Sequence, residues 1–167
     1  MKKILATLTL LLALGLVAAP AQAQVSFELG PRVGYDAGDV EELFIGADVR
    51  VSSAALPLII NPTFDYYFIE DVGDVDNGLW ALSVNALYPF GVSNAVFTPY
   101  GGAGVGLYNF SFGDSSTTDV GLNLVFGAQF LNTGVVKPFV EAQYSPIFSD
   151  PENTNLFTVK GGLLFGF

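Results

Sequence analysis

The chain has 167 residues, of which 51% are hydrophobic and 13% charged, with 16 acidic against 6 basic residues and a formal net charge of −10. This length predicts a single domain, and the acidic balance disfavours nucleic-acid binding, which relies on Lys and Arg to neutralise phosphates. His and Cys are absent, which excludes Ser-His and Cys-His nucleophiles, disulfides and most zinc sites.

The first element in chain order is typical of export. Lys2 and Lys3 precede an apolar run over residues 4–17, and small residues follow at 21–23. These are the three parts of a secretory signal peptide, whereas the run is short of the roughly 20 residues that a membrane-spanning helix requires. We expect residues 1–23 to be a cleaved signal peptide and residues 24–167 to form one domain with four basic and 16 acidic residues.

Beyond residue 24 the sequence alternates with a period of two residues. Such alternation predicts β-strands with an apolar face and a face of small, polar or charged residues. No stretch approaches 18 uninterrupted apolar residues, which argues against membrane helices. The alternating segments are, in chain order, 25–35, 43–51, 58–68, 80–88, 98–108, 119–130, 137–144 and 157–167.

The connecting segments alternate in length. Short ones are expected at 52–55, 91–95 and 132–134, and longer polar ones at 36–42, 70–77, 109–117 and 146–155. Short turns at one rim and long loops at the other are typical of an outer-membrane barrel, as are aromatic residues near strand ends. We therefore predict an all-β fold: an eight-stranded antiparallel up-and-down transmembrane β-barrel with short periplasmic turns and longer extracellular loops.

The charged residues decide which face meets lipid. A soluble barrel of lipocalin type also alternates, but it keeps apolar residues inside and polar ones in water. Here every basic residue after position 24 lies on the polar face, together with four carboxylates. Matched charges are required inside a narrow barrel, because an unpaired buried charge costs several kcal/mol. We therefore predict that the apolar face meets lipid and that the polar face forms a structural ion-pair network in the lumen. The predicted network consists of Glu28, Arg32, Asp48, Arg50, Asp65, Lys137, Glu141 and Lys160.

Four segments carry a resemblance to a known family. They are "ALYPFG" at 86–91, "TPYGGAGVGL" at 98–107, "KPFVEAQY" at 137–144 and the last strand ending in Phe167. Through them, residues 24–167 resemble the small outer-membrane β-barrel proteins of the OmpA-transmembrane, OmpX and opacity-protein type. The resemblance implies a location in the outer membrane of a Gram-negative bacterium, in contact with lipid and lipopolysaccharide. It also implies that Phe165 and Phe167 form a C-terminal assembly signal, read by the barrel-assembly machinery.

Twelve carboxylates remain in or beside the expected loops. We expect a non-enzymatic, monomeric barrel that meets an unknown extracellular partner through them, without catalytic residues, cofactor or dedicated metal site. Two further interpretations of these carboxylates stay open: binding of divalent cations that bridge lipopolysaccharide, which is the less favoured one, and adaptation to a saline habitat. A small channel opened by rearrangement of the lumen charges is the alternative, and a lipid-modifying enzyme is less favoured because no catalytic constellation stands out. The twelve are Asp36, Asp39, Glu41, Glu42, Glu70, Asp71, Asp74, Asp76, Asp114, Asp119, Asp150 and Glu152.

Overall fold

The computed structural model describes residues 25–70, 76–90, 96–130, 134–150 and 152–167. The signal peptide expected at 1–23, the turn expected at 91–95 and most of the turn expected at 132–134 lie outside these residues. Within the described residues, no helix is long and apolar enough to cross a membrane.

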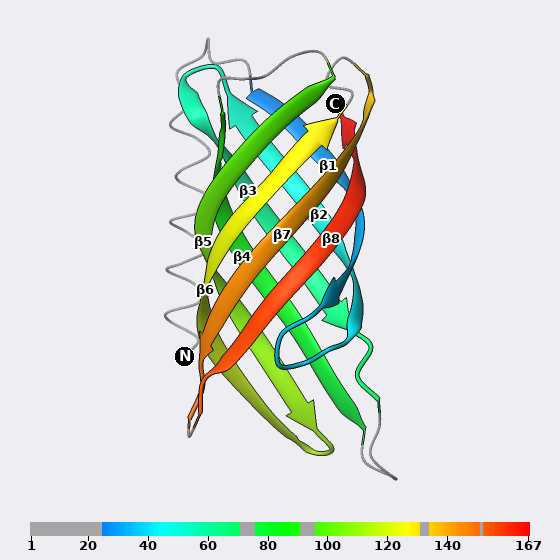
Figure 1. Ribbon diagram of the computed structural model, residues 1–167, viewed down its shortest axis with the longest axis vertical. Coiled ribbons are helices and arrows are strands. Elements are labelled where there is room, and N and C mark those ends of the chain that lie inside the picture. Colours follow the sequence, from blue (N-terminus) through cyan, green and yellow to red (C-terminus); the bar gives the residue numbers. More distant parts are fainter. Residues whose placement is uncertain (1–24, 71–75, 91–95, 131–133, 151) are drawn as a thin grey trace.

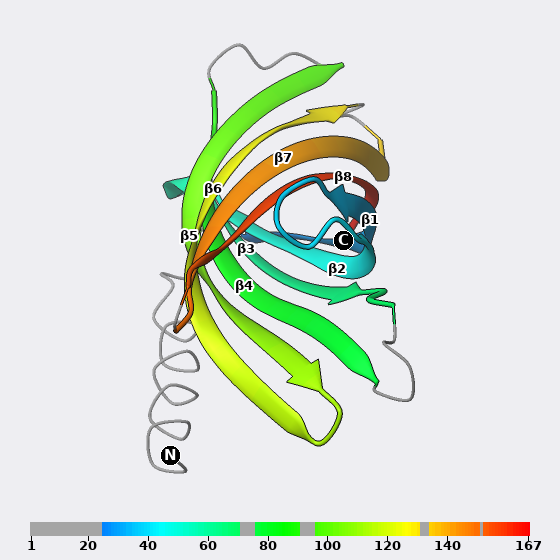
Figure 2. The same ribbon diagram turned by 60° about the horizontal axis from the view of Figure 1, so that its bottom comes forward.

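Eight antiparallel strands form a closed barrel in which each strand pairs with its neighbours in sequence, and β1 pairs with β8 (Figure 1). The prediction of an up-and-down eight-stranded barrel is therefore confirmed. Figure 2 shows β8 beside β1, where the ring closes. The strands are β1 (Val25–Asp36), β2 (Leu43–Ser53), β3 (Leu56–Tyr67), β4 (Asn77–Pro89), β5 (Phe97–Phe112), β6 (Ser115–Phe130), β7 (Val136–Phe148) and β8 (Thr154–Gly166).

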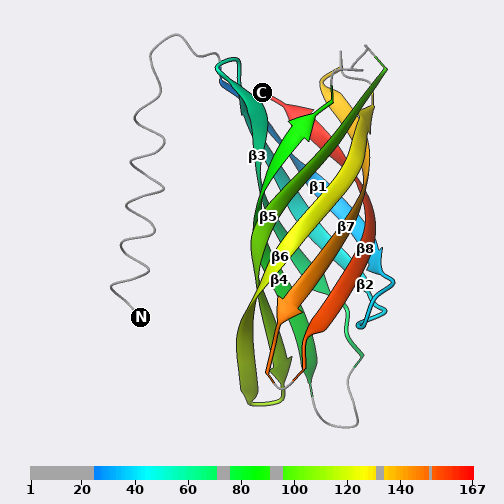
Figure 3. The same cartoon turned by 60° about the vertical axis from the view of Figure 1, so that its left-hand side comes forward.

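The two ends of the barrel differ. At one end, here called the terminal rim, β1 begins and β8 ends (Figure 3). At the other end, here called the loop rim, β1, β3, β5 and β7 end and β2, β4, β6 and β8 begin. An even number of strands produces this arrangement, because successive antiparallel strands return the chain to the end where it started.

One predicted loop is wrong. Residues 109–117 were expected to form a long connection, but β5 runs to Phe112 and β6 starts at Ser115, so only Gly113 and Asp114 join them. Gly113 has φ 54°, the left-handed conformation that a two-residue hairpin turn favours and glycine adopts without strain. The prediction failed because the segment is polar. A strand that extends beyond the apolar band faces water, so a polar sequence there does not indicate a loop.

The connection at 146–155 is also shorter than expected, because β7 continues to Phe148 and β8 begins at Thr154. The β5–β6 hairpin extends further at this rim than its neighbour β7. The pairing of β6 with β7 ends at Val120 and Phe148, so residues 115–119 reach past the end of β7. The hairpin therefore forms a raised wall beside the barrel mouth.

The outer face is apolar and the inner face is mixed, the reverse of a soluble lipocalin-type barrel. Inside, buried polar and charged side chains occupy the middle of the barrel, between two apolar layers. The loop-side layer consists of Phe44, Tyr67, Leu79, Ala81, Tyr108, Ile147 and Leu156, and Val40, Ile69 and Phe110 pack against it. The terminal-side layer consists of Leu87, Tyr100 and Val125, with Ile59 against it.

Candidate functional site

Six of the eight charged residues predicted for the lumen meet in one chain of ion pairs. Arg32 lies 3.3 Å from Asp48 and 2.5 Å from Asp65, and Arg32 Nε donates to Asp65 at 2.7 Å. Asp48 also pairs with Arg50 at 3.1 Å. We call these six residues the ion-pair chain: Arg32, Asp48, Arg50, Asp65, Glu141 and Lys160.

Two cations of the ion-pair chain share the carboxylate of Glu141. Glu141 lies 3.7 Å from Arg50 and 3.0 Å from Lys160. Every member of the ion-pair chain is buried, and three cations face three carboxylates. Formal neutrality of the set is what its burial requires, because each unpaired charge in a low-dielectric interior would cost several kcal/mol.

Arg50 lies against two aromatic rings. Its guanidinium carbon lies 4.7 Å from the ring centre of Tyr100 and 4.6 Å from that of Phe139. It donates to the Tyr100 hydroxyl at 2.8 Å and to Gln129 at 3.1 Å, and the Tyr100 hydroxyl donates to Glu141 at 3.0 Å. The planar guanidinium therefore has partners both at its edge and on its faces, as arginine favours at buried sites.

The other two predicted lumen residues lie apart from the ion-pair chain. Lys137 pairs with Glu28 at 2.5 Å, and their side chains are 19% and 12% exposed. Glu28 is near the start of β1 and Lys137 near the start of β7, so the pair belongs to the terminal rim. Because solvent reaches the Lys137–Glu28 pair, we expect it to stabilise the barrel less than the buried ion-pair chain does.

Neutral polar residues complete the interior, and the sequence analysis did not assign them to the network. Asn61 donates to Asp48 at 2.9 Å, Asn123 donates to Asn85 at 2.9 Å, and Asn85 lies 3.4 Å from Asn61. Tyr108 donates to Asn123 at 2.7 Å, which carries the hydrogen bonds up to the loop-side layer. These residues could have been assigned to the interior from the sequence, because they lie on the polar face of the strands and that face points inward.

The carboxylates expected in the loops have different environments. Asp36 is buried, and its side chain accepts hydrogen bonds from the backbone N–H groups of Val40, Glu41 and Phe157 at 2.8–3.2 Å. It therefore organises the β1–β2 connection, and its burial makes it unsuited to contact with a partner. Asp71 and Asp74 lie outside the described residues. Within those residues, no group of three or more acidic side chains is arranged to hold a metal ion.

Comparison with known proteins identifies the family. A family model described as "Outer membrane protein beta-barrel domain" matches residues 9–165. The chain belongs to this family. A search among curated proteins finds no match.

Solved structures of other outer-membrane barrels share the fold. Neisserial surface protein A is 16% identical, with a TM-score of 0.61 over 85% of this chain and 95% of its own. The N-terminal barrel of Pseudomonas aeruginosa OprF is 17% identical, with a TM-score of 0.59 over 86% and 100%. The attachment invasion locus protein Ail of Yersinia pestis is 18% identical, with a TM-score of 0.60 over 86% and 97%. At these identities the likeness shows the fold alone.

The filled interior of this outer-membrane barrel leads to a prediction about conductance. Apolar layers lie on both sides of the ion-pair chain, and an eight-stranded barrel is only wide enough for its own side chains. We expect planar-bilayer recordings of the refolded protein to show no discrete conductance steps, with a known porin as positive control. Steps of constant size that appear only with the barrel would show that the charged side chains rearrange into an ion path.

Proposed function

We propose that this protein is a non-enzymatic integral barrel of the bacterial outer membrane that makes surface interactions through the acidic residues of its loop rim. The signal peptide at 1–23 would direct export, and the loop rim would face the cell exterior. Phe165 and Phe167, at the end of β8 and just beyond it, would serve as the assembly signal. Lipid and lipopolysaccharide would surround a monomeric barrel.

The main support for this proposal is the distribution of basic and acidic residues between the strands and the loop rim. The four basic residues of the described chain are all in ion pairs on the strands, with carboxylates as partners. No Lys or Arg occurs in the connections of the loop rim, whereas most of the remaining carboxylates are there. A rim with one sign of charge favours basic partners and accelerates their encounter with the barrel.

Loop neutralisation tests the proposal. A variant with Glu41→Gln, Glu70→Gln and Glu152→Gln removes three carboxylates that are exposed and take no part in the ion pairs of the barrel interior. Cells displaying the wild type would be tested against a panel of purified extracellular and envelope proteins. We expect basic proteins to bind, and the variant to bind them several-fold less, with a difference that shrinks as salt is added.

A matched control keeps the charge unchanged. Ser115→Ala with Ser116→Ala alters two exposed residues of the same rim and should bind like the wild type. If no protein of the panel binds, or if the neutralised variant binds as well as the control, surface interaction through acidic loops is wrong.

A further inference from the structure

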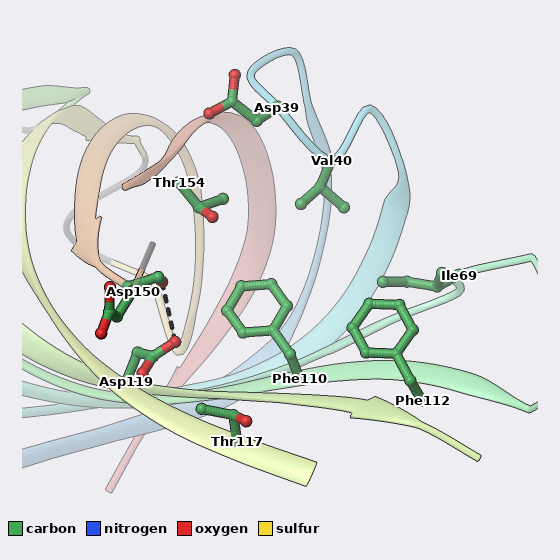
Figure 4. Close-up of a pocket in the computed structure, with 10 residues that line it drawn as sticks. Asp39, Val40, Ile69, Phe110, Phe112, Thr117, Asp119, Asp150 and Thr154 are labelled. Atoms are coloured by element: carbon green, nitrogen blue, oxygen red, sulfur yellow. Dashed lines mark hydrogen bonds between the residues drawn. The ribbon is translucent and has the colours of Figure 1, made fainter. Parts of the chain in front are cut away.

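The loop rim contains a hollow of about 450 Å³ that the proposed surface role does not explain. Its apolar lining comes from Val40, Ile69, Phe110 and Phe112. Asp39, Asp119 and Asp150 bring three carboxylates to the same hollow from three different segments (Figure 4). Its volume falls in the range of small-molecule sites, which combine an apolar lining with a few polar groups.

The floor of the hollow is closed. Val40, Ile69 and Phe110 pack against the loop-side apolar layer, so the hollow ends at that layer. Phe112 alternates with Phe110 and Tyr108 on the inward face of β5, and it lines the mouth while 63% exposed. Its side chain is therefore largely open to solvent at the mouth of the hollow, and exposed apolar surface of this kind commonly marks a binding site.

The carboxylates have hydrogen-bond donors but no cation. Asp119 accepts from the Ser149 hydroxyl at 2.9 Å, and Asp39 accepts from the backbone N–H of Asn155 at 2.7 Å. Asp150 follows Ser149 directly, which places it beside Asp119, as Figure 4 shows. Within the described residues, each Lys and Arg is paired with other carboxylates, so the charge of these three is uncompensated by the protein.

We propose that this hollow binds a small organic cation, an ammonium group attached to an aromatic or branched apolar body. The body would cover the rings of Phe110 and Phe112, and the cation would lie toward Asp119 and Asp150. Aromatic faces attract ammonium groups, and the carboxylates add attraction by charge. A metal ion fits less well because, within the described residues, no three carboxylates are grouped to hold one, and an anion is repelled. The inference relies on the proposed function only in that the loop rim faces the cell exterior.

Benzyltrimethylammonium is a suitable probe because it is permanently charged and water-soluble. Titrated into the isotopically labelled barrel in zwitterionic nanodiscs, it should shift the NMR signals of Phe110, Phe112 and Asp119 saturably. Tetramethylammonium, which lacks the ring, and benzyl alcohol, which lacks the charge, should each bind at least ten-fold more weakly. Binding should weaken as salt is added.

Variants locate the site. Asp119→Asn with Asp150→Asn should raise the dissociation constant of the probe about ten-fold, since two charge contacts that solvent reaches each contribute a few-fold. Phe112→Ala should raise it several-fold, whereas Glu152→Gln, in the same loop as Asp150 but outside the hollow, should leave it unchanged. All variants must retain heat-modifiable gel mobility, which reports a folded barrel.

Three results would overturn the inference: no saturable shift, equal binding of benzyl alcohol, or equal binding by the Asp119/Asp150 variant. None of them bears on the surface role, because Glu41, Glu70 and Glu152, which test that role, do not line the hollow. Conversely, loss of partner binding in the loop variant with probe binding retained would separate the two functions.

Discussion

Replacing Arg32 by Met is expected to destabilise the barrel by about 3–5 kcal/mol, the cost of leaving buried carboxylates without their cation. Asp65 has Arg32 as its only ion-pair partner in the described structure, and Asp48 would keep only Arg50. The Met side chain fills much of the volume of the arginine stem, so the loss is electrostatic rather than a cavity effect. Unfolding by urea in phospholipid vesicles, followed by the fluorescence of Trp80, measures the change.

Two variants distinguish this explanation from a general sensitivity of the barrel interior. Asp65→Asn in the Arg32→Met background removes the orphaned charge and should recover a substantial part of the lost stability. Lys137→Met breaks the partly exposed pair with Glu28 and should cost only about 1 kcal/mol or less. Equal losses for Arg32→Met and Lys137→Met would contradict a special role for the ion-pair chain.

The fold was predictable because alternation with a period of two survives in every strand. Each strand has to present lipid-facing residues at every second position, and eight such segments in one chain leave few other architectures. The strand ends were less predictable. The segment from Asn109 to Thr118 is polar, yet it pairs in register with alternating inward Phe110 and Phe112. Composition indicates where the membrane ends, and strand pairing continues beyond it.

The alternation along each strand predicted which charged residues face the interior. It did not predict which of them join the ion-pair chain and which lie near a rim. Arg32 and Lys137 lie on the same face of their strands, and only the register and tilt of the barrel place one in the ion-pair chain and the other near a rim. Glycines of the inward face leave space for larger side chains of the interior. Two of them make room for rings: a Cβ at Gly106 would lie 2.7 Å from the ring of Tyr108, and one at Gly162 would lie 2.6 Å from that of Phe139.

The apolar layers and the hollow at the loop rim depend on residues that are distant in sequence. Phe44, Tyr108 and Ile147 come from three strands and meet only because the barrel closes. In the same way, Asp39 and Asp119 reach one hollow from the first connection and the β5–β6 wall. Contacts between residues so far apart in the sequence leave no motif of fixed spacing, so the sequence analysis could not predict the apolar layers or the hollow.

Leu124→Arg should lower the stability of the barrel in a bilayer by about 2–4 kcal/mol, the cost of a charge on the lipid face near mid-membrane. Leu124 is 51% exposed and follows Asn123, whose side chain belongs to the central polar region of the interior. Phe148, the last residue of β7 at the loop rim, is similarly exposed at 54%. Because charge is tolerated near the interface, Phe148→Arg should cost only about 0–1 kcal/mol.

The two variants are matched in exposure and in the introduced side chain, and differ in depth along the barrel. Urea unfolding in phospholipid vesicles should therefore separate them by about 2 kcal/mol, the depth dependence expected on a lipid-facing surface. If the outer face met water, both substitutions would be surface changes within about 0.5 kcal/mol of the wild type. Similar small effects at Leu124 and Phe148 would show that the apolar outer face is not embedded in lipid, and a large loss at both would place the membrane boundary beyond the end of β7.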